Sequence, residues 1–343
     1  MALDVQKRES FHEATKLGAT PIRDLGLTIG GTRLEPILAD FERELEAKGI
    51  RRLRPRFYLS TEWGVPEGSI AIAIPFYLAR AELTQLHAQR TGHVEGFSRR
   101  DILRYLRHEM GHVVNYAYRL FEDRDWVCCF GSMTQPYVET YRPEPFSRRF
   151  VRHLPGWYAQ KHPDEDWAET FAVWMTPGKS WREEYADWAE ALGKLEYCDK
   201  ILAAVADRDP VVTVADLDED VAELEYSIDD FYRSLADGEA EPRGLDGALR
   251  AIFEDLSAEE AQAEVRAASA LIARLEQELV ANVYRWTGHF PEKTQKLLHH
   301  LARRADDLVL SYRADGEEAA VIALTTLVTA LAMNHVHKGS YLP

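Results

Sequence analysis

The chain has 343 residues, of which 46% are hydrophobic and 29% are charged, so it is long and apolar enough to bury a substantial core. Its formal net charge of −16 argues against general nucleic-acid binding, because an acidic surface repels phosphate groups. Residues 201–343 hold 27 acidic and 13 basic side chains, a net charge of −14, and we interpret this surplus as a well-solvated surface.

Cysteine content and hydropathy bear on where the protein works. The three cysteines are an odd number without the spacing of a disulfide framework. Residues 1–17 are polar and predict a loose leader, not a signal peptide. The longest largely apolar run, residues 319–333, predicts a buried helix, not a membrane span. We therefore expect a cytoplasmic protein that binds neither nucleic acid nor membrane.

The N-terminal part predicts a helix followed by two strands. Apolar residues recur at helical spacing over residues 33–49, and Gly49 is placed to end that helix. Residues 54–60 predict a strand. In the next strand Ile70, Ile72 and Ile74 alternate with alanine, which predicts one buried face. Pro75 cannot donate to a strand ladder, so we place that end of the strand at a sheet edge.

Two helices dominate the middle of the chain. Ser98 is a favourable N-cap and predicts a helix that continues to about Tyr118. Pro163 lies near the start of a second helical pattern, which ends after Met175. From about residue 201 onward the pattern is mostly helical.

The first of these helices carries the sequence His108-Glu-Met-Gly-His112. Histidines at i and i+4 project from one helix face, so both imidazoles can reach one zinc ion. Glu109 then lies beside the open coordination position, where its carboxylate can take a proton from zinc-bound water. Gly111 leaves space for a second backbone or for substrate. A chance match on a surface helix is the alternative, but the motif lies inside an apolar pattern, where unliganded polar groups are costly to bury.

A catalytic zinc ion usually has three protein ligands, and the second helix offers the third. Glu165 and Glu169 stand at i and i+4 and share a face, while Ala168 and Ala172 are small enough for a close approach of the two helices. We assign Glu165 as the third ligand and Glu169 as an acceptor that orients a zinc-bound histidine. The alternative is that these acidic residues only complement the dipole at the start of the helix. That explanation accounts less well for Glu169 than the metal site does.

These motifs resemble the gluzincin metallopeptidases. The stretch from Glu165 to Glu169 is similar to the catalytic motif of lethal-factor-type proteases, and residues 142–158 and 162–172 resemble a family of bacterial zinc-binding metallopeptidases. In the lethal-factor type a tyrosine seven residues before the glutamate ligand reaches the site. The resemblance therefore assigns that place to Tyr158, as a donor to the oxyanion or the leaving group; an ordinary packed aromatic is the alternative.

The resemblance also implies a fold. Zincins place an edge strand beside the metal, so we predict that Ile72, Ala73 and Ile74 hold an extended substrate by main-chain hydrogen bonds. We expect an α+β fold, with a zincin-like domain of a small twisted mixed sheet and an active-site helix over residues 18–200. A mostly helical, acidic region should follow over residues 201–343. Recruitment of an unidentified protein partner is one function left open for this region.

The sequence thus predicts zinc-dependent hydrolysis of peptide bonds in a peptide or protein substrate, with Glu109 activating a zinc-bound water. One alternative is a zinc hydrolase that acts on a non-peptide amide. Another is a zincin-fold binding or scaffold protein without turnover.

Overall fold

The computed structural model describes residues 18–138, 141–178, 180–236, 244–254 and 264–341. The predicted leader, residues 1–17, lies outside this range. The chain forms two compact units: the first covers residues up to 86, 95–134 and 167–239, and the second covers 87–94, 135–166 and 240–343. The predicted domain limits, 18–200 and 201–343, stay a prediction.

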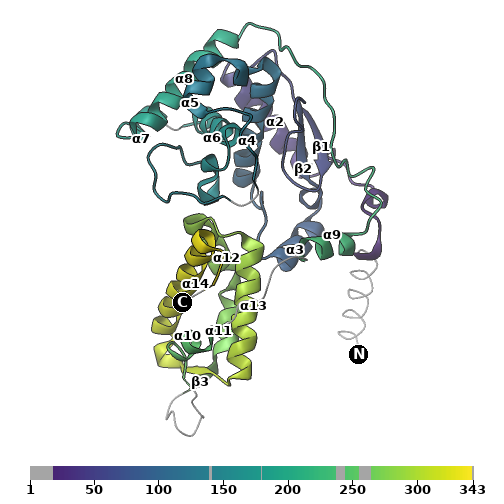
Figure 1. The fold of residues 1–343 in the computed structure, drawn as a ribbon. Coiled ribbons are helices and arrows are strands. Elements are labelled where there is room, and N and C mark those ends of the chain that lie inside the picture. The colour runs from purple at the N-terminus through teal and green to yellow at the C-terminus, as the bar shows by residue number, and fades with distance from the viewer. Residues whose placement is uncertain (1–17, 139–140, 179, 237–243, 255–263, 342–343) are drawn as a thin grey trace. The chain divides into compact units, whose positions relative to one another are not determined.

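The first unit holds the parallel sheet and most of the helices of the N-terminal half (Figure 1). Its elements are η1 (Ile22–Leu25), α2 (Leu34–Ala47), β1 (Arg56–Ser60), β2 (Ala71–Pro75), η2 (Phe76–Leu78), α3 (Ala81–Thr91), α4 (Arg99–Tyr118), η3 (Leu120–Glu122), α5 (Arg124–Phe130), α6 (Pro163–Met175), α7 (Trp181–Glu184), α8 (Ala189–Val205) and α9 (Ile228–Ala236). The last residues of α3 and the first residues of α6 are grouped with the second unit.

The two predicted N-terminal strands are present, and they pair in parallel with Tyr58 opposite Ala73. All five residues of β2 are buried, so the prediction of a single buried face was wrong. The second face is covered because Ala215 and Leu217 pack against the cluster formed by Tyr58, Ala71 and Ala73. On the side of β2 away from β1, the Ala73 N–H donates to the Gly64 carbonyl at 2.8 Å.

Helix α4 is the central element of the first unit, and both of its ends are explained by local chemistry. Ser98 is the N-cap, as the sequence predicted, and it forms a capping box with Asp101. Arg119 ends the helix in a left-handed conformation. Arg107 binds both carboxylate oxygens of Glu44 at 2.8 Å, which ties α4 to α2. In Figure 1, α4 lies between α6 and the β1–β2 pair.

Helices α4 and α6 approach so closely that only glycine fits at their contact. A Cβ atom on Gly111 would lie 2.7 Å from the Cα of Ala168 and 3.1 Å from its carbonyl oxygen. The Trp167 Nε1–H donates to the Gly111 carbonyl at 2.8 Å in the same contact. The space that Gly111 provides is therefore taken by the α6 backbone, which decides between the two possibilities left open by the sequence.

The acidic residues after α8 form an extended segment that packs on the sheet. No helix is formed between α8 and α9, which begins at Ile228, although this stretch falls in the region predicted to be mostly helical. The segment reaches the sheet through Val214, whose carbonyl accepts from Ile70 N–H, and through Asp218, whose carbonyl accepts from the Tyr58 hydroxyl. Proline, valine and clustered aspartates disfavour helix here, and the sheet surface offers the segment an alternative set of hydrogen bonds.

The second unit is mainly helical, with its own apolar core. Its elements are η4 (Pro155–Gln160), α10 (Asp246–Arg250), β3 (Val265–Ala267), α11 (Ala268–Arg274), α12 (Glu276–Thr287), α13 (Pro291–Asp307), β4 (Ser311–Arg313), η5 (Ala314–Gly316) and α14 (Glu317–Lys338). Strands β3 and β4 pair antiparallel. The core is built from leucines such as Leu249, Leu271, Leu298 and Leu324. Segment η4 packs against α12, so the second unit also anchors residues that precede α6.

Helix α14 is less buried than predicted. It buries one stripe that includes Leu324, Val328 and Leu331, whereas Ile322 on the other side is 65% exposed. By length and composition, the helical stretch Ala314–Lys338 could cross a membrane: its most apolar window has a mean hydropathy of 1.7 and is 28% buried. Because core helices of soluble proteins pass the same test, the predicted cytoplasmic location stays a prediction.

Helices and small sheets together confirm the predicted α+β class. Among the described residues the strands form two separate two-stranded sheets, one parallel and one antiparallel. The finer expectation, a zincin-like arrangement, stays a prediction. A sheet on one side of α4 and α6 on the other is compatible with that arrangement.

The α4–α6 contact predicts the effect of Gly111→Ala. The added methyl group meets backbone and cannot be relieved by a side-chain rotation, so we expect a loss of about 1–3 kcal/mol in the free energy of unfolding. Gly193→Ala in α8 is the matched control, because nothing lies within 4 Å of its Cβ position, and it should be neutral or stabilising. Thermal unfolding of the metal-free proteins measures both, and equal stability of the two variants would contradict the close contact.

Candidate metal centre

The two histidines of α4 face the same point. Both side chains are buried, and His108 Nε2 and His112 Nε2 are 3.2 Å apart. This separation fits a hydrogen bond between neutral rings. It also fits two ligands of one zinc ion, because nitrogens 2.0–2.1 Å from a tetrahedral zinc lie about 3.3 Å from each other.

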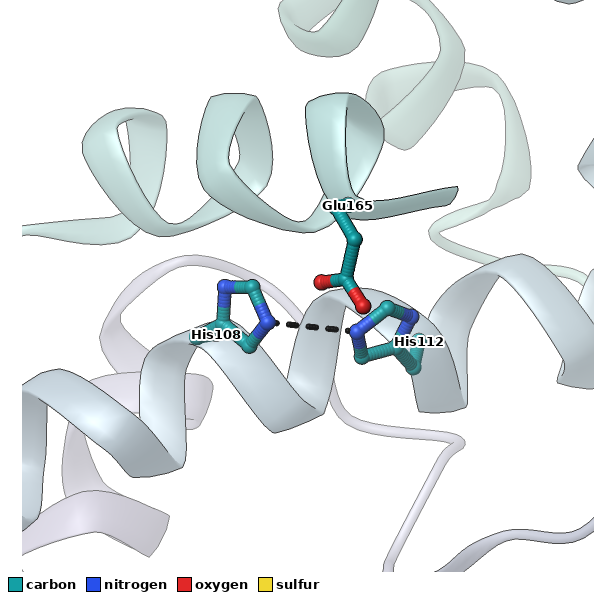
Figure 2. A group of neighbouring side chains, drawn as sticks. All are labelled: His108, His112 and Glu165. Carbon is teal, nitrogen blue, oxygen red and sulfur yellow. Dashed lines mark hydrogen bonds between the residues drawn. The ribbon is translucent and has the colours of Figure 1, made fainter. Parts of the chain in front are cut away.

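Glu165 joins the histidine pair from α6. Its carboxylate points toward the two rings (Figure 2), and one ligand atom from each of His108, His112 and Glu165 lies within 4.8 Å of the others. All three side chains are buried. Two neutral imidazoles and one carboxylate are a ligand set that zinc accepts in proteins, so the residues present fit the ion that the sequence predicted.

Glu169 lies one turn further along α6 and reaches back to α4. Its Oε1 atom is 2.9 Å from His108 Nδ1, and the Glu169 side chain is fully buried. A carboxylate at Nδ1 favours the tautomer that carries the proton there, which leaves Nε2 with its lone pair for a metal. The predicted function of Glu169 as an orienting acceptor therefore has a direct geometric basis.

Helices α4 and α6 bury several acidic groups. Glu109 on α4 and Asp164, Glu165, Asp166 and Glu169 on α6 are each at most 5% exposed. The first turn of α6 stabilises part of this negative charge through the helix dipole. Buried carboxylates are otherwise costly unless they are paired or bind a cation, so this electrostatic environment favours a metal ion.

His162 caps the start of α6. Its Nδ1 accepts from the Asp164 N–H at 3.2 Å, and its Nε2–H donates to the Gln135 carbonyl at 3.0 Å. These two bonds occupy both ring nitrogens of a neutral imidazole. His162 therefore has a structural role at the start of α6.

Tyr158 and residues 72–74 are the other site residues that the sequence predicted. Tyr158 is half-buried in η4, and the Lys161 Nζ lies 5.3 Å from its ring centroid. Ile72, Ala73 and Ile74 are buried in β2, which packs against α4. The catalytic role of Tyr158 and the substrate-binding role of the strand stay predictions.

Sequence reasoning missed Tyr137. Its hydroxyl donates to Glu165 Oε1 at 2.5 Å, so it touches one member of the metal group directly. Tyr137 lies outside helices and strands, in a polar segment with prolines. No periodicity or motif spacing there could have indicated this contact.

The group His108–His112–Glu165 lies within a segment that matches a protein family. Residues 61–251, more than half of the chain, match the family described as "Putative zinc-binding metallo-peptidase". The chain belongs to this family. The predicted resemblance to bacterial zinc-binding metallopeptidases is thereby confirmed, and membership points to zinc-dependent peptidase activity. Neither the curated proteins nor the solved structures include a match to this chain.

The geometry predicts how metal binding responds to single substitutions. Wild-type protein should bind one zinc ion per chain, and His112→Ala should lose it, because one of three ligands is removed. His299→Ala is the matched control: this histidine is exposed on α13, where it contacts Glu276, and its loss should leave one ion bound. Elemental analysis after dialysis against trace zinc measures both. Full zinc content in the His112 variant would contradict the assignment.

Proposed function

We propose that the protein is a zinc-dependent peptidase of the gluzincin type, in which His108, His112 and Glu165 bind the ion and Glu109 acts as general base. The observation that carries this proposal is the buried group of two α4 histidines and one α6 carboxylate. It is supported by membership of a family described as zinc-binding metallopeptidases.

The number of ligands supports turnover over a purely structural role. Among the described residues the group has three members. Catalytic zinc sites typically use three protein ligands and keep one position open, whereas structural sites are closed by four. A general base beside the ligands also has no purpose in a structural site. Both features favour an enzyme over a scaffold protein.

The proposed role of Glu109 is to move protons. A zinc ion bound by the group would lower the pKa of a coordinated water to about 7 and polarise a carbonyl. Glu109 follows His108 directly on α4, and its side chain is buried. Its carboxylate takes the proton of the attacking water and passes it to the leaving nitrogen of the peptide. In the same proposal the Tyr158 hydroxyl donates a hydrogen bond to the oxyanion.

Substrate alignment is assigned to β2. An extended peptide would pair with the main chain of residues 72–74, beside α4. Because the Ala73 N–H already donates to Gly64, substrate would have to replace this contact or pair beyond it. Residues 61–64, which precede β2, are thus part of the proposed substrate site.

A cytoplasmic location completes the proposal. All three cysteines are free, and Cys128 is exposed, which fits a reducing compartment. The negative charge of residues 201–343 remains consistent with a solvated surface. A protein partner for this region stays a proposal without an identified candidate.

Glu109→Gln separates metal binding from turnover. The amide cannot accept the proton of the attacking water, so we expect cleavage to fall by at least about 100-fold while one zinc ion stays bound. Glu122→Gln, an exposed substitution just beyond α4, should retain full activity. Cleavage of a broad peptide library, with and without chelator, measures activity, and elemental analysis measures zinc.

The outcomes of this experiment distinguish the alternatives. Loss of zinc from the Glu109 variant would show that this residue is a ligand and not the base. Wild-type protein that holds zinc but cleaves no peptide would contradict peptidase activity. Chelator-sensitive hydrolysis of non-peptide amides would then point to a different amide substrate.

A further inference from the structure

Tyr137 makes a short hydrogen bond to a proposed metal ligand. Its hydroxyl lies 2.5 Å from Glu165 Oε1. Bonds of about 2.5–2.7 Å are typical of a hydroxyl that donates to an ionised carboxylate, which is the form that binds a metal. Glu165 is buried, whereas Tyr137 is 49% exposed, so the phenol reaches the ligand from the solvent side.

The two residues that precede α6 also hold Tyr137 in place. The Lys161 ammonium lies 4.3 Å from the centre of the Tyr137 ring, and the His162 ring centroid lies 5.2 Å from it. His162 in turn donates to the carbonyl of Gln135, two residues before Tyr137. The tyrosine and the helix that carries Glu165 are therefore fixed by one set of contacts.

We propose that Tyr137 is a positioning residue for the metal centre: it holds Glu165 Oε1, so that the other carboxylate oxygen faces the two histidine nitrogens. This inference rests on the proposed metal site. A glutamate side chain has three rotatable bonds, and only some of its rotamers direct an oxygen to the shared point. Fixing one oxygen restricts the carboxylate to single-oxygen ligation and reduces the ordering that metal binding requires.

Together with the Glu169–His108 contact, this gives the centre one orienting group for a ligand of each helix. Glu169 fixes an imidazole of α4, and Tyr137 fixes the carboxylate of α6. Removal of one contact of this kind typically lowers metal affinity by about 10–100-fold. Tyr137 acts through Glu165, which separates its role from the one proposed for Tyr158.

The test compares two tyrosines of the same segment. Tyr137→Phe removes the bond to Glu165, whereas Tyr141→Phe removes a bond of similar length, 2.6 Å, to the Gly156 carbonyl. Zinc affinity of the metal-free proteins is measured by competition with a chromophoric chelator. We expect about a 10–100-fold loss for Tyr137→Phe and none for Tyr141→Phe. The cobalt-substituted Tyr137 variant should also show an altered visible spectrum, because its carboxylate is no longer held.

A second experiment is needed if Tyr137→Phe destabilises the whole structure: the same substitution is made in a protein that already carries Glu165→Asp. Glu165→Asp shortens the ligand, which withdraws its carboxylate from the Tyr137 hydroxyl. In that background Tyr137→Phe should cause no further loss of zinc affinity, since its effect passes through Glu165. Thermal unfolding of the metal-free variants accompanies each measurement, and the metal-free stabilities of Tyr137→Phe and Tyr141→Phe should be similar.

The results separate this inference from the metal site itself. If wild-type protein binds zinc and Tyr137→Phe binds it equally well, the positioning role is overturned and the metal site stands. Equal losses for both tyrosine variants, or an undiminished loss in the Glu165→Asp background, overturn it too. Failure of the wild-type protein to bind zinc would instead reject the proposed function.

Discussion

The close approach of α4 and α6 at Gly111 and Ala168 is the constraint on which the site depends. With a Cβ at position 111 only 2.7 Å from the Ala168 Cα, the two backbones could not lie this close. At this spacing the short reach of a glutamate suffices to bring Glu165 and Glu169 to the histidines. The glycine inside the histidine motif is therefore a packing requirement, and the buried Trp167 bond to its carbonyl fixes the same contact.

Within the second unit, the chain that leads into α6 packs against α12. A Cβ at Gly156 would lie 3.0 Å from the Tyr284 ring, so η4 lies against α12. The helices near the C-terminus thus anchor the segment that supplies Tyr158, Lys161 and Glu165.

Local patterns predicted the helices well, because each has its own chemical signals. Ser98 with Asp101, Pro163 and Gly49 mark helix ends through capping, proline preference and positive φ. The same patterns predicted the i, i+4 histidines and the pair of glutamates. Features set by long-range packing were not predictable: the second buried face of β2, the extended segment before α9, the exposed side of α14 and the Tyr137 contact. Each depends on which distant surface is available, and periodicity carries no information on that.

The central claim is that one ion is shared by two imidazoles of α4 and a carboxylate of α6. Anomalous diffraction at the zinc absorption edge, from crystals of the zinc-loaded protein, tests it most directly. A single peak about 2.0–2.2 Å from the Nε2 atoms of His108 and His112 and from a Glu165 oxygen, with no fourth protein ligand, is the result expected. A peak at the histidines of α13 or α14, or one that Glu165 does not reach, would contradict the account.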